Sequence, residues 1–292
     1  SSLSPPPTWQ PPPPPPLGPP ADNDAAAGKA AAEVAAHDFL GRWPDHSQRA
    51  GAGPNPICMA VHCGKQMLAC ELERSMCAKG LSCTQACGKN NNTLACLYGC
   101  LNSYEDAAYS DFVRCAMTDH HCIPSPPPPA GQIKQCTVPK RINATFNVTS
   151  ALSGRWYIPV GLNPVIDCYP CQYGDWTFEG AQQQQQQVHF TFKVPTLQGG
   201  FRNRTLDENV SLAGSGSGVS FSLLAHADGL DQRQNFTVIA AREDVILAYW
   251  CADNNIGSLL EGINVYTRAK KLPVGAEAWV KEQAEAAGFD YA

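Results

Sequence analysis

The sequence lacks a long apolar stretch, an excess of basic residues and an initial methionine. No uninterrupted apolar stretch approaches the roughly 18 to 20 residues that cross a membrane as a helix. Lys and Arg number 21 against 26 Asp and Glu, so a net charge of −5 provides no basic surface for nucleic acid. The chain also begins at Ser1 rather than at a methionine, so we expect a processed form or a fragment. These absences argue against a spanning helix and against nucleic acid as a partner.

Zinc-finger spacing is also lacking, although cysteine itself is abundant. Of 14 cysteines, ten lie between Cys58 and Cys122, and no Cys-x-x-Cys pair occurs among them. The histidines of this block, His62, His120 and His121, are not spaced as zinc ligands. Pairable cysteines at this density are typical of an oxidising compartment. We therefore predict disulfides and no metal.

The spacing of the ten cysteines predicts nested disulfides. Cys83 and Cys87, and then Cys96 and Cys100, stand four residues apart, and residues at this spacing share one face of a helix. Two such helices folded back as a hairpin join the outer pair and the inner pair. The preceding block allows the same nesting, although spacing alone leaves many connectivities open. The predicted set is Cys58–Cys77, Cys63–Cys70, Cys83–Cys100, Cys87–Cys96 and Cys115–Cys122.

The N-terminal half separates into three segments by composition. Residues 1–55 are rich in proline and alanine, which predicts a disordered arm with little apolar surface to bury. Residues 56–123 predict a cysteine-rich helical domain that is too small for apolar burial alone to stabilise. Residues 124–135 contain a second proline run, which indicates a linker.

The C-terminal half predicts a mainly β domain followed by one helix. Over residues 136–272, short runs of β-branched and aromatic residues alternate with turn signals, as in a sandwich or an up-and-down barrel. Residues 273–292 predict the helix, with Ala278, Val280 and Ala284 roughly on one side. The predicted strands lie at residues 144–148, 155–160, 188–194, 219–224, 235–240, 245–250 and 262–267.

Two groups of residues carry a resemblance to known families. Gly-Arg-Trp ending at Trp156, with a late Arg268, resembles the lipocalin signature, in which the arginine packs on the tryptophan and closes the barrel floor. Combined with the ten-cysteine unit and with the segments at 161–172 and 264–268, the pattern resembles the violaxanthin de-epoxidase family. The resemblance covers about residues 56–290, and its details are closer to the family's "related" branch.

The resemblance implies a fold, an activity and a location. The fold is a lipocalin-like antiparallel β-barrel with a small disulfide-rich helical N-terminal domain. In the family, L-ascorbate is the co-substrate for reductive opening of a carotenoid epoxide, from violaxanthin to antheraxanthin and zeaxanthin. Acidification of the thylakoid lumen switches the enzyme on, since a carboxylic acid donates a proton only while it is protonated. The partners implied are the xanthophyll, transiently the thylakoid lipid surface, and a homodimer at acidic pH.

Matched to the family pattern, three residues bear on catalysis. Asp167 and Tyr266 take catalytic positions, with Asp167 orienting or protonating the epoxide. Gln234 stands where the family has its catalytic acid, and an amide cannot act as a general acid. The nearest upstream acid, Asp231, lies at an odd offset and so on the opposite strand face. Gln234 therefore enters the predicted site as a substrate-binding residue.

The same pattern assigns the remaining contacts. Gln172 would hydrogen-bond the substrate, and Tyr249 or Trp250 would stack on its polyene. Because neighbouring strand residues point to opposite faces, at most one of these two aromatics lines a cavity. Trp156 and Arg268 would close the barrel structurally.

Four cysteines lie outside the nested set. The family's barrel cysteine matches Cys171, and Cys251 is the predicted replacement for its usual partner. Cys136 would then pair with Cys168. The spacing of Cys168 and Cys171 also resembles that of a redox pair, but it lacks the strand-to-helix context of a thioredoxin site. A redox-sensing module, whose barrel responds to reduction of its bridges, is a weaker alternative.

Two broader alternatives stay open. A lipocalin that binds a carotenoid or another hydrophobic ligand without chemistry is favoured by Gln234. A secreted glycoprotein is favoured by Asn-x-Ser/Thr sequons. These lie at Asn91, Asn143, Asn147, Asn203, Asn209 and Asn235.

Overall fold

The computed structural model describes most of the chain beyond the N-terminal arm. The described residues are 55–72, 76–87, 93–124, 135–143, 145–163, 167, 169–179, 185–212, 220–253 and 259–291. The predicted arm and linker lie almost wholly outside these residues. Every helix in the described part of the chain is too short or too polar to span a bilayer.

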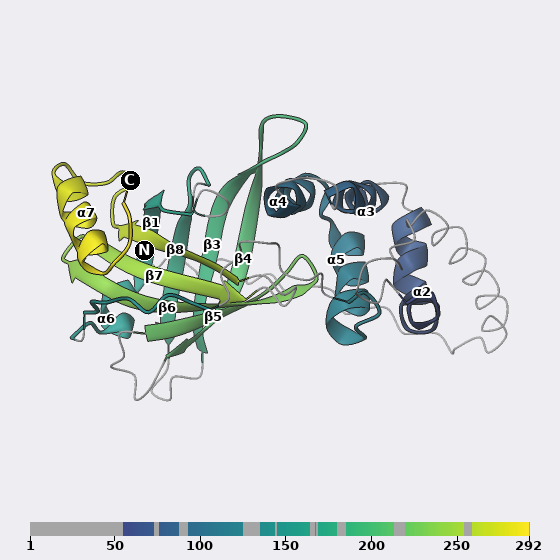
Figure 1. Cartoon of the computed structure of the whole chain (residues 1–292), viewed down its shortest axis with the longest axis horizontal. Helices are drawn as coiled ribbons and strands as arrows, with labels where there is room; N and C mark the ends of the chain where they lie inside the picture. Colours follow the sequence, from purple (N-terminus) through teal and green to yellow (C-terminus); the bar gives the residue numbers. More distant parts are fainter. Residues whose placement is uncertain are drawn as a thin grey trace, which may run out of the picture.

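Helices form an N-terminal domain that lies beyond one end of a β-barrel (Figure 1). Its core buries large side chains such as Met59, Leu81 and Phe112 among the disulfides. Asp106 caps the N-terminus of the helix that begins at Ala107, because its carboxylate accepts a hydrogen bond from the Tyr109 backbone N–H at 2.8 Å. The elements are α2 (Pro56–Leu72), α3 (Met76–Cys87), α4 (Thr93–Tyr104), α5 (Ala107–Val113) and the π-helix η1 (Arg114–Asp119).

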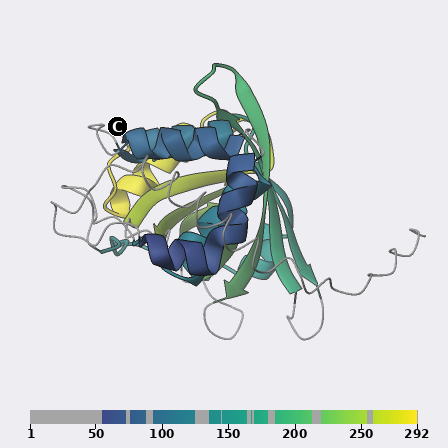
Figure 2. The same cartoon turned by 90° about the vertical axis from the view of Figure 1, so that its right-hand side faces the viewer.

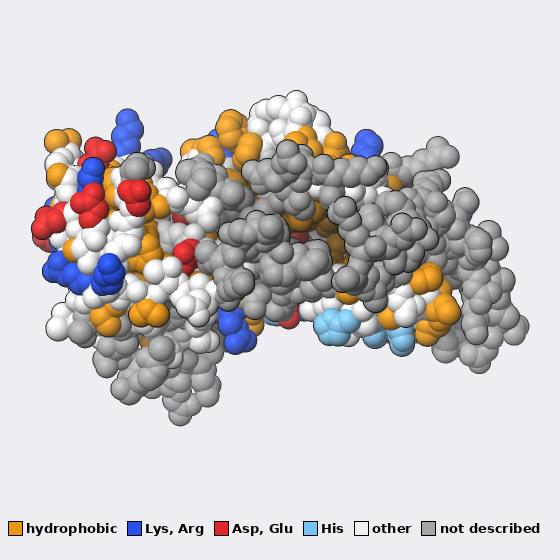
Figure 3. Space-filling model, viewed as in Figure 1, with side chains coloured by type: hydrophobic (Ala, Val, Ile, Leu, Met, Phe, Trp, Pro, Cys, Tyr) orange, Lys and Arg blue, Asp and Glu red, His pale blue; other side chains and the backbone are white. Residues whose placement is uncertain are grey.

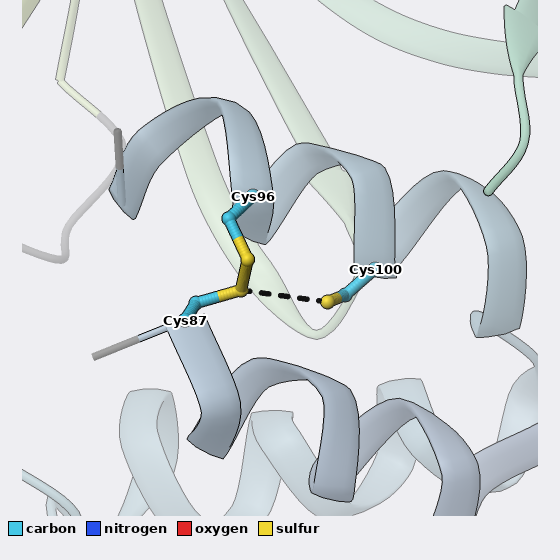
Figure 4. A group of neighbouring side chains, drawn as sticks. All are labelled: Cys87, Cys96 and Cys100. Atoms are coloured by element: carbon cyan, nitrogen blue, oxygen red, sulfur yellow. Dashed lines mark hydrogen bonds between the residues drawn. A yellow bond between two sulfur atoms is a disulfide. The ribbon is translucent and has the colours of Figure 1, made fainter. Parts of the chain in front are cut away.

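The predicted helical hairpin is confirmed. Cys83–Cys100 and Cys87–Cys96 both join α3 to α4, with Cα separations of 5.7 and 5.6 Å. The two bridges touch, since the Cys87 and Cys100 sulfurs lie 3.5 Å apart (Figure 4). Spacing of four residues on two short helices, together with a hairpin between them, therefore predicted both pairs correctly.

The other three predicted pairs, Cys58–Cys77, Cys63–Cys70 and Cys115–Cys122, are wrong. Cys63 and Cys70 lie in one helix, about 10 Å apart along its axis. A disulfide needs Cα atoms roughly 4.4–6.8 Å apart, so these two cannot pair. Instead α2 packs against α5 and η1. The bridges observed are Cys58–Cys122, Cys63–Cys115 and Cys70–Cys77.

The predicted mainly β fold with a disulfide-rich helical domain is confirmed. Eight antiparallel strands pair in chain order, and β1 closes the barrel on β8. Figure 2 looks along the molecule from the helical domain, whose helices lie across the barrel end. The strands are β1 (Gly154–Gly161), β2 (Tyr173–Glu179), β3 (Gln185–Pro195), β4 (Phe201–Leu212), β5 (Ser220–Ala227), β6 (Leu230–Arg242), β7 (Val245–Asp253) and β8 (Leu259–Thr267).

Two local predictions are wrong in detail. The strand predicted at 144–148 gives way to a short helix, α6 (Val148–Leu152). The reason is a helix cap, because the Asn147 side chain accepts a hydrogen bond from the Ser150 N–H at 3.0 Å. The C-terminal helix, α7 (Ala276–Ala286), buries Val280 and Ala284 against the outside of the barrel, but Ala278 is exposed.

The closed end of the barrel is held by Arg268. Its guanidinium lies over the Trp156 ring, 3.9 Å from the centroid, and donates to the carbonyls of Arg155, Ala151 and Ser153 at 2.9, 3.1 and 3.0 Å. The planar guanidinium fork of Arg268 thus links the end of β8 to the start of β1 and to α6.

Replacing Arg268 with alanine is expected to lower the free energy of unfolding by about 2 kcal/mol, through lost hydrogen bonds and the cation–π contact. Chemical denaturation with the disulfides intact measures the change. Arg268→Lys is the matched control, because it keeps the charge but not the fork. A lysine variant as stable as the native protein would show that charge alone closes this end.

The other end of the barrel is joined to the helical domain by polar contacts. Arg202 of β4 donates to the Glu105 carboxylate at 2.9 Å, and Arg114 of η1 donates to Asp231 of β6 at 3.1 Å. The Ser103 hydroxyl of α4 accepts from the Leu197 N–H at 2.7 Å. These contacts hold α4 over the barrel interior.

Candidate active site

The barrel encloses a small polar cavity at the end covered by α4. Its volume is about 110 Å³, because aromatic rings, among them Trp176 and Phe221, fill much of the interior. Polar and aromatic side chains reach it from the β1–β2 connection and from β4, β6, β7 and β8. Six of them matter for chemistry: Asp167, Gln172, Glu208, Gln234, Trp250 and Tyr266.

Asp167 lies in this wall as a buried carboxyl, 5% exposed. Its Oδ2 accepts hydrogen bonds from the Asn163 backbone N–H at 2.9 Å and from Trp250 Nε1 at 3.3 Å. Gly262 makes room for it, since a Cβ there would lie 2.6 Å from Oδ2. Burial raises the pKa of Asp167 to about 7, and the two hydrogen bonds offset only part of this rise. The carboxyl is therefore protonated in weakly acidic solution.

A second buried carboxyl, Glu208, faces the same cavity from β4. It is 2% exposed, and its Oε2 has no hydrogen-bond partner among the described residues. Burial raises its pKa to about 8. Sequence reasoning missed Glu208 because β4 was not among the predicted strands. A signal exists, since Leu206, Glu208 and Val210 share one face of a strand, and a carboxyl between two apolar residues on one face is unusual.

Tyr266 of β8 lines the same cavity as the two carboxyls. Its ring is fully buried, and its hydroxyl has no hydrogen-bond partner among the described residues. Burial raises its pKa well above the usual range, and the nearby charges of Glu208 and Asp167 raise it further. The Asn264 side chain lowers that pKa, with an effect second only to burial, and the Asn264 Oδ1 has no hydrogen-bond partner among the described residues. Both carboxyls thus approach one hydroxyl from different walls.

The structure also places the predicted binding residues. Gln172, Gln234 and Trp250 line the cavity, and the Gln172 Oε1 is buried without a partner among the described residues. Of the two aromatics offered as alternatives for the polyene, Trp250 lies in the cavity wall and Tyr249 does not. It points outward from β7, stacks on Phe289 with ring centroids 5.1 Å apart, and donates to Glu261 at 2.7 Å. Strand alternation sends Trp250 inward and Tyr249 outward.

A larger cleft adjoins the cavity on the outer side of the β1–β2 connection. Its volume is about 890 Å³, and apolar and basic side chains such as Tyr157, Leu272 and Lys270 line it. The cleft and the cavity share Asp167 and Gln172 in their walls, with Ile158 and Tyr169. A single layer of side chains therefore separates the two spaces.

The predicted bridges Cys136–Cys168 and Cys171–Cys251 are wrong. Cys136 pairs with Cys251, and Cys171 is a free, exposed thiol in the wall of the outer cleft. Cys168 lies outside the described residues. Because Trp250 faces inward, the next residue of the strand, Cys251, faces outward. The segment that carries Cys136 lies on this outer side, since the backbone N–H and hydroxyl of Thr137 donate to the Glu261 carboxylate.

Metal-ligand groupings are few in the part of the chain that the structure describes. Cys87, Cys96 and Cys100 lie within ligand distance of one another, but all three are in disulfides (Figure 4). The histidines of the helical domain lie at its surface (Figure 3), where His62 and His120 stack with ring centroids 4.5 Å apart. A disulfide sulfur is a poor ligand, so the cysteine group has no metal-binding chemistry while oxidised.

Fold and cavity together define a class: a closed eight-stranded barrel of the lipocalin type, with two buried carboxylic acids facing one interior space. A family model described as the VDE lipocalin domain matches residues 55–292, and the chain belongs to that family.

The chain is similar to curated plant proteins named "Violaxanthin de-epoxidase, chloroplastic". Identity is 24% over 239 residues for the protein of Arabidopsis thaliana and 21% over 242 residues for that of Spinacia oleracea. Each match covers 80% of this chain but only 50% and 49% of the relative, so the chain spans about half their length.

Among solved structures, lobster apocrustacyanin A1 aligns over 54% of this chain and 88% of its own, at 12% identity and a TM-score of 0.35. The siderocalin Ex-FABP aligns over 48% of this chain and 89% of its own, at 13% identity and a TM-score of 0.34.

Proposed function

We propose that this protein is an oxidoreductase that reductively de-epoxidises a xanthophyll at the cavity between Asp167 and Tyr266, with ascorbate as co-substrate. The observation that supports it most is a group of buried polar atoms in the cavity wall that have no hydrogen-bond partner among the described residues. These are Gln172 Oε1, Glu208 Oε2, Asn264 Oδ1 and the Tyr266 hydroxyl. Each such buried atom costs about 1–3 kcal/mol when left unpaired. A small polar group of a ligand, such as an epoxide with a neighbouring hydroxyl, would pair them.

The residues that line the cavity can supply the protons, and the shielding from water, that reduction of an epoxide requires. The epoxide oxygen must accept two protons to leave as water, while two electrons from ascorbate restore the carbon–carbon double bond and ascorbate becomes dehydroascorbate. Asp167, protonated in weakly acidic solution and fixed by Trp250, is placed to give the first proton. The apolar walls limit capture of the developing cation by water. Trp250 thus acts on Asp167 rather than on the polyene.

The two spaces suggest how a long pigment binds. A cavity of about 110 Å³ is too small for a whole carotenoid, since ligand pockets usually measure about 300–1,000 Å³. The adjoining cleft, about 890 Å³, has the size for a polyene. We infer that the polyene lies in the cleft along Tyr157 and Leu272, and that the end ring enters the cavity past Ile158 and Tyr169.

A pigment assay tests the proposed function directly. Oxidised, purified protein is mixed with violaxanthin in galactolipid micelles, with and without ascorbate, at pH 5 and pH 8. We expect antheraxanthin and zeaxanthin at pH 5 with ascorbate only, because Asp167 is largely ionised at pH 8. Chromatography measures the products. Equal turnover at both pH values would contradict proton donation by a buried acid.

A second candidate is a pigment-binding lipocalin without chemistry. Gln234 favours it, because this amide lines the cavity at the position where the family pattern has an acid. Pigment that co-elutes with the protein, with no product at pH 5, would establish this candidate in place of the enzyme.

We propose the thylakoid lumen as the compartment. The plant relatives are named as chloroplastic, and six cysteine pairs need an oxidising space. Transient contact with thylakoid lipid and a homodimer at acidic pH belong to the same proposal. Secretion is the rival, since the sequon residues Asn147, Asn203 and Asn209 are exposed. A mass shift on enzymatic deglycosylation of the native protein would favour secretion.

A further inference from the structure

Glu208 is a buried carboxyl that the architecture of the barrel does not require. Its neighbours on the adjacent strands are Val188 and Ala225, and both are apolar and fully buried. A carboxyl in such surroundings is costly to bury, even in its neutral form, unless its oxygens are hydrogen-bonded. Its Oε2 is unpaired among the described residues, so packing alone gives no reason for an acid here.

The cation closest along β4 does not neutralise Glu208. Arg204 lies on the same strand face but binds Asp228, with a nitrogen–oxygen distance of 2.5 Å. Besides Arg204 and Asp228, the titratable groups that line this cavity with Glu208 are Tyr98 from α4, Asp167 and Tyr169 from the β1–β2 connection, and Tyr266 from β8. Glu208 keeps its proton because it is buried, which raises its pKa.

The de-epoxidation proposed above requires a second proton donor, and the inference rests on that proposed function. Removing an epoxide oxygen as water takes two protons, whereas opening the ring takes only one. We propose that Glu208 is the second proton donor, the catalytic acid that protonates the opened hydroxyl so that it leaves as water. Asp167 supplies the first proton as the first carbon–oxygen bond breaks. Ascorbic acid, an enediol reductant, delivers two electrons to the opened ring as this water leaves, so that the second carbon–oxygen bond breaks while the double bond forms. Its two protons restore both carboxylic acids as it becomes dehydroascorbate.

The position of Glu208 also relates to Gln234. The two residues lie on β4 and β6, with β5 between them, and line the same cavity. Where the family pattern has an acid on β6, this chain has an amide there and an acid on the neighbouring wall. In this chain the proton donor is therefore on β4 instead of β6.

The test compares Glu208→Gln with Asp167→Asn in two assays. With ascorbate at pH 5, Glu208→Gln is expected to lower kcat for de-epoxidation by at least 100-fold, with KM for violaxanthin unchanged within about threefold. Without reductant, one acid is enough to open a 5,6-epoxide and reclose it as the 5,8-furanoid isomer. Glu208→Gln should keep this isomerisation within about threefold of the native rate, whereas Asp167→Asn should lose it.

Three further variants act as controls. Asp207→Asn changes the adjacent, outward-facing acid of β4, which binds His189, and should leave both assays within twofold. Glu208→Asp keeps the carboxyl and should retain at least a tenth of the native rate, as should the relocation variant Glu208→Gln/Gln234→Glu.

The outcomes separate the two proposals. A Glu208→Gln protein that forms zeaxanthin at the native rate overturns the role of Glu208 and leaves the proposed function standing. Loss of isomerisation together with de-epoxidation in Glu208→Gln would make Glu208 the first donor instead, which also overturns the assignment. A native protein that binds violaxanthin but forms neither product overturns the proposed function, and with it the second donor.

Discussion

Replacing Asp167 with asparagine is expected to lower the rate of violaxanthin de-epoxidation by about 10²- to 10⁴-fold, the usual contribution of a general acid. Asparagine has nearly the same shape, and its oxygen can still accept from Trp250 and from the Asn163 N–H, so the wall of the cavity is preserved. What is lost is the proton that the buried carboxyl holds near neutral pH. Chromatography of the pigments at pH 5 with ascorbate measures the effect.

The matched control for this variant is Asp175→Asn. Asp175 lies on β2 in the same half of the barrel, but its carboxylate is solvent-accessible and bound by Arg155 at 2.6 Å, which lowers its pKa. We expect turnover within about threefold of the native rate. An Asp167→Asn protein with native turnover would remove Asp167 from the mechanism, and a similar loss in both variants would point to a general effect on the barrel.

The stability of the native protein is expected to fall as the pH rises from about 4 to about 8. Burial raises the pKa of Asp167 from its ordinary value of 3.8 to about 7 and that of Glu208 from 4.5 to about 8. Between those limits the folded state binds more protons than the unfolded state, so stability decreases with pH. A raised pKa is worth about 1.4 kcal/mol per unit, which gives a loss on the order of 4 kcal/mol for each carboxyl.

Denaturant unfolding at pH 5 and pH 8, with the disulfides intact, measures this slope. The double variant Asp167→Asn/Glu208→Gln should flatten it and be more stable than the native protein at pH 8, because neither amide ionises. Asp207→Asn, on the outer face of β4, should keep the native slope. A native protein that is equally stable at pH 5 and pH 8 would show that the two carboxyls are not buried as acids.

The predicted loss of activity and the predicted loss of stability have the same physical cause. Burial keeps the two carboxyls neutral, so the site is loaded with protons in acid, and the same burial makes the ionised site costly to the fold. An enzyme of this design is active where it is most stable. Stability should decline from about pH 4 upward, whereas proton donation should be lost only as the pH passes the folded-state pKa values of about 7 and about 8. Loss of activity should therefore begin near neutral pH, where most of the loss of stability has already occurred.

Much of the candidate site could be predicted because it follows strand alternation and short motifs. Asp167, Gln172 and Tyr266 were placed from the family pattern, and alternation along β7 required that Trp250 and Tyr249 face opposite sides. Which of the two faced inward was decided by the barrel, since the register sets Trp250 opposite Gly262. Glu208 was missed because its strand has polar residues on both faces, and only closure of the barrel buries one of them.

By itself, the sequence determined the features that depend on neighbours in the chain. Cysteines four residues apart on two short helices specified the hairpin bridges, and runs of alternating residues specified most strands. Only the tertiary structure decided the partners of Cys58, Cys63 and Cys251, since these bridges span 64, 52 and 115 residues. It also decided the burial of Glu208. The physical reason is that local spacing encodes secondary structure, whereas long-range pairing and the desolvation of a carboxyl depend on how those elements pack together.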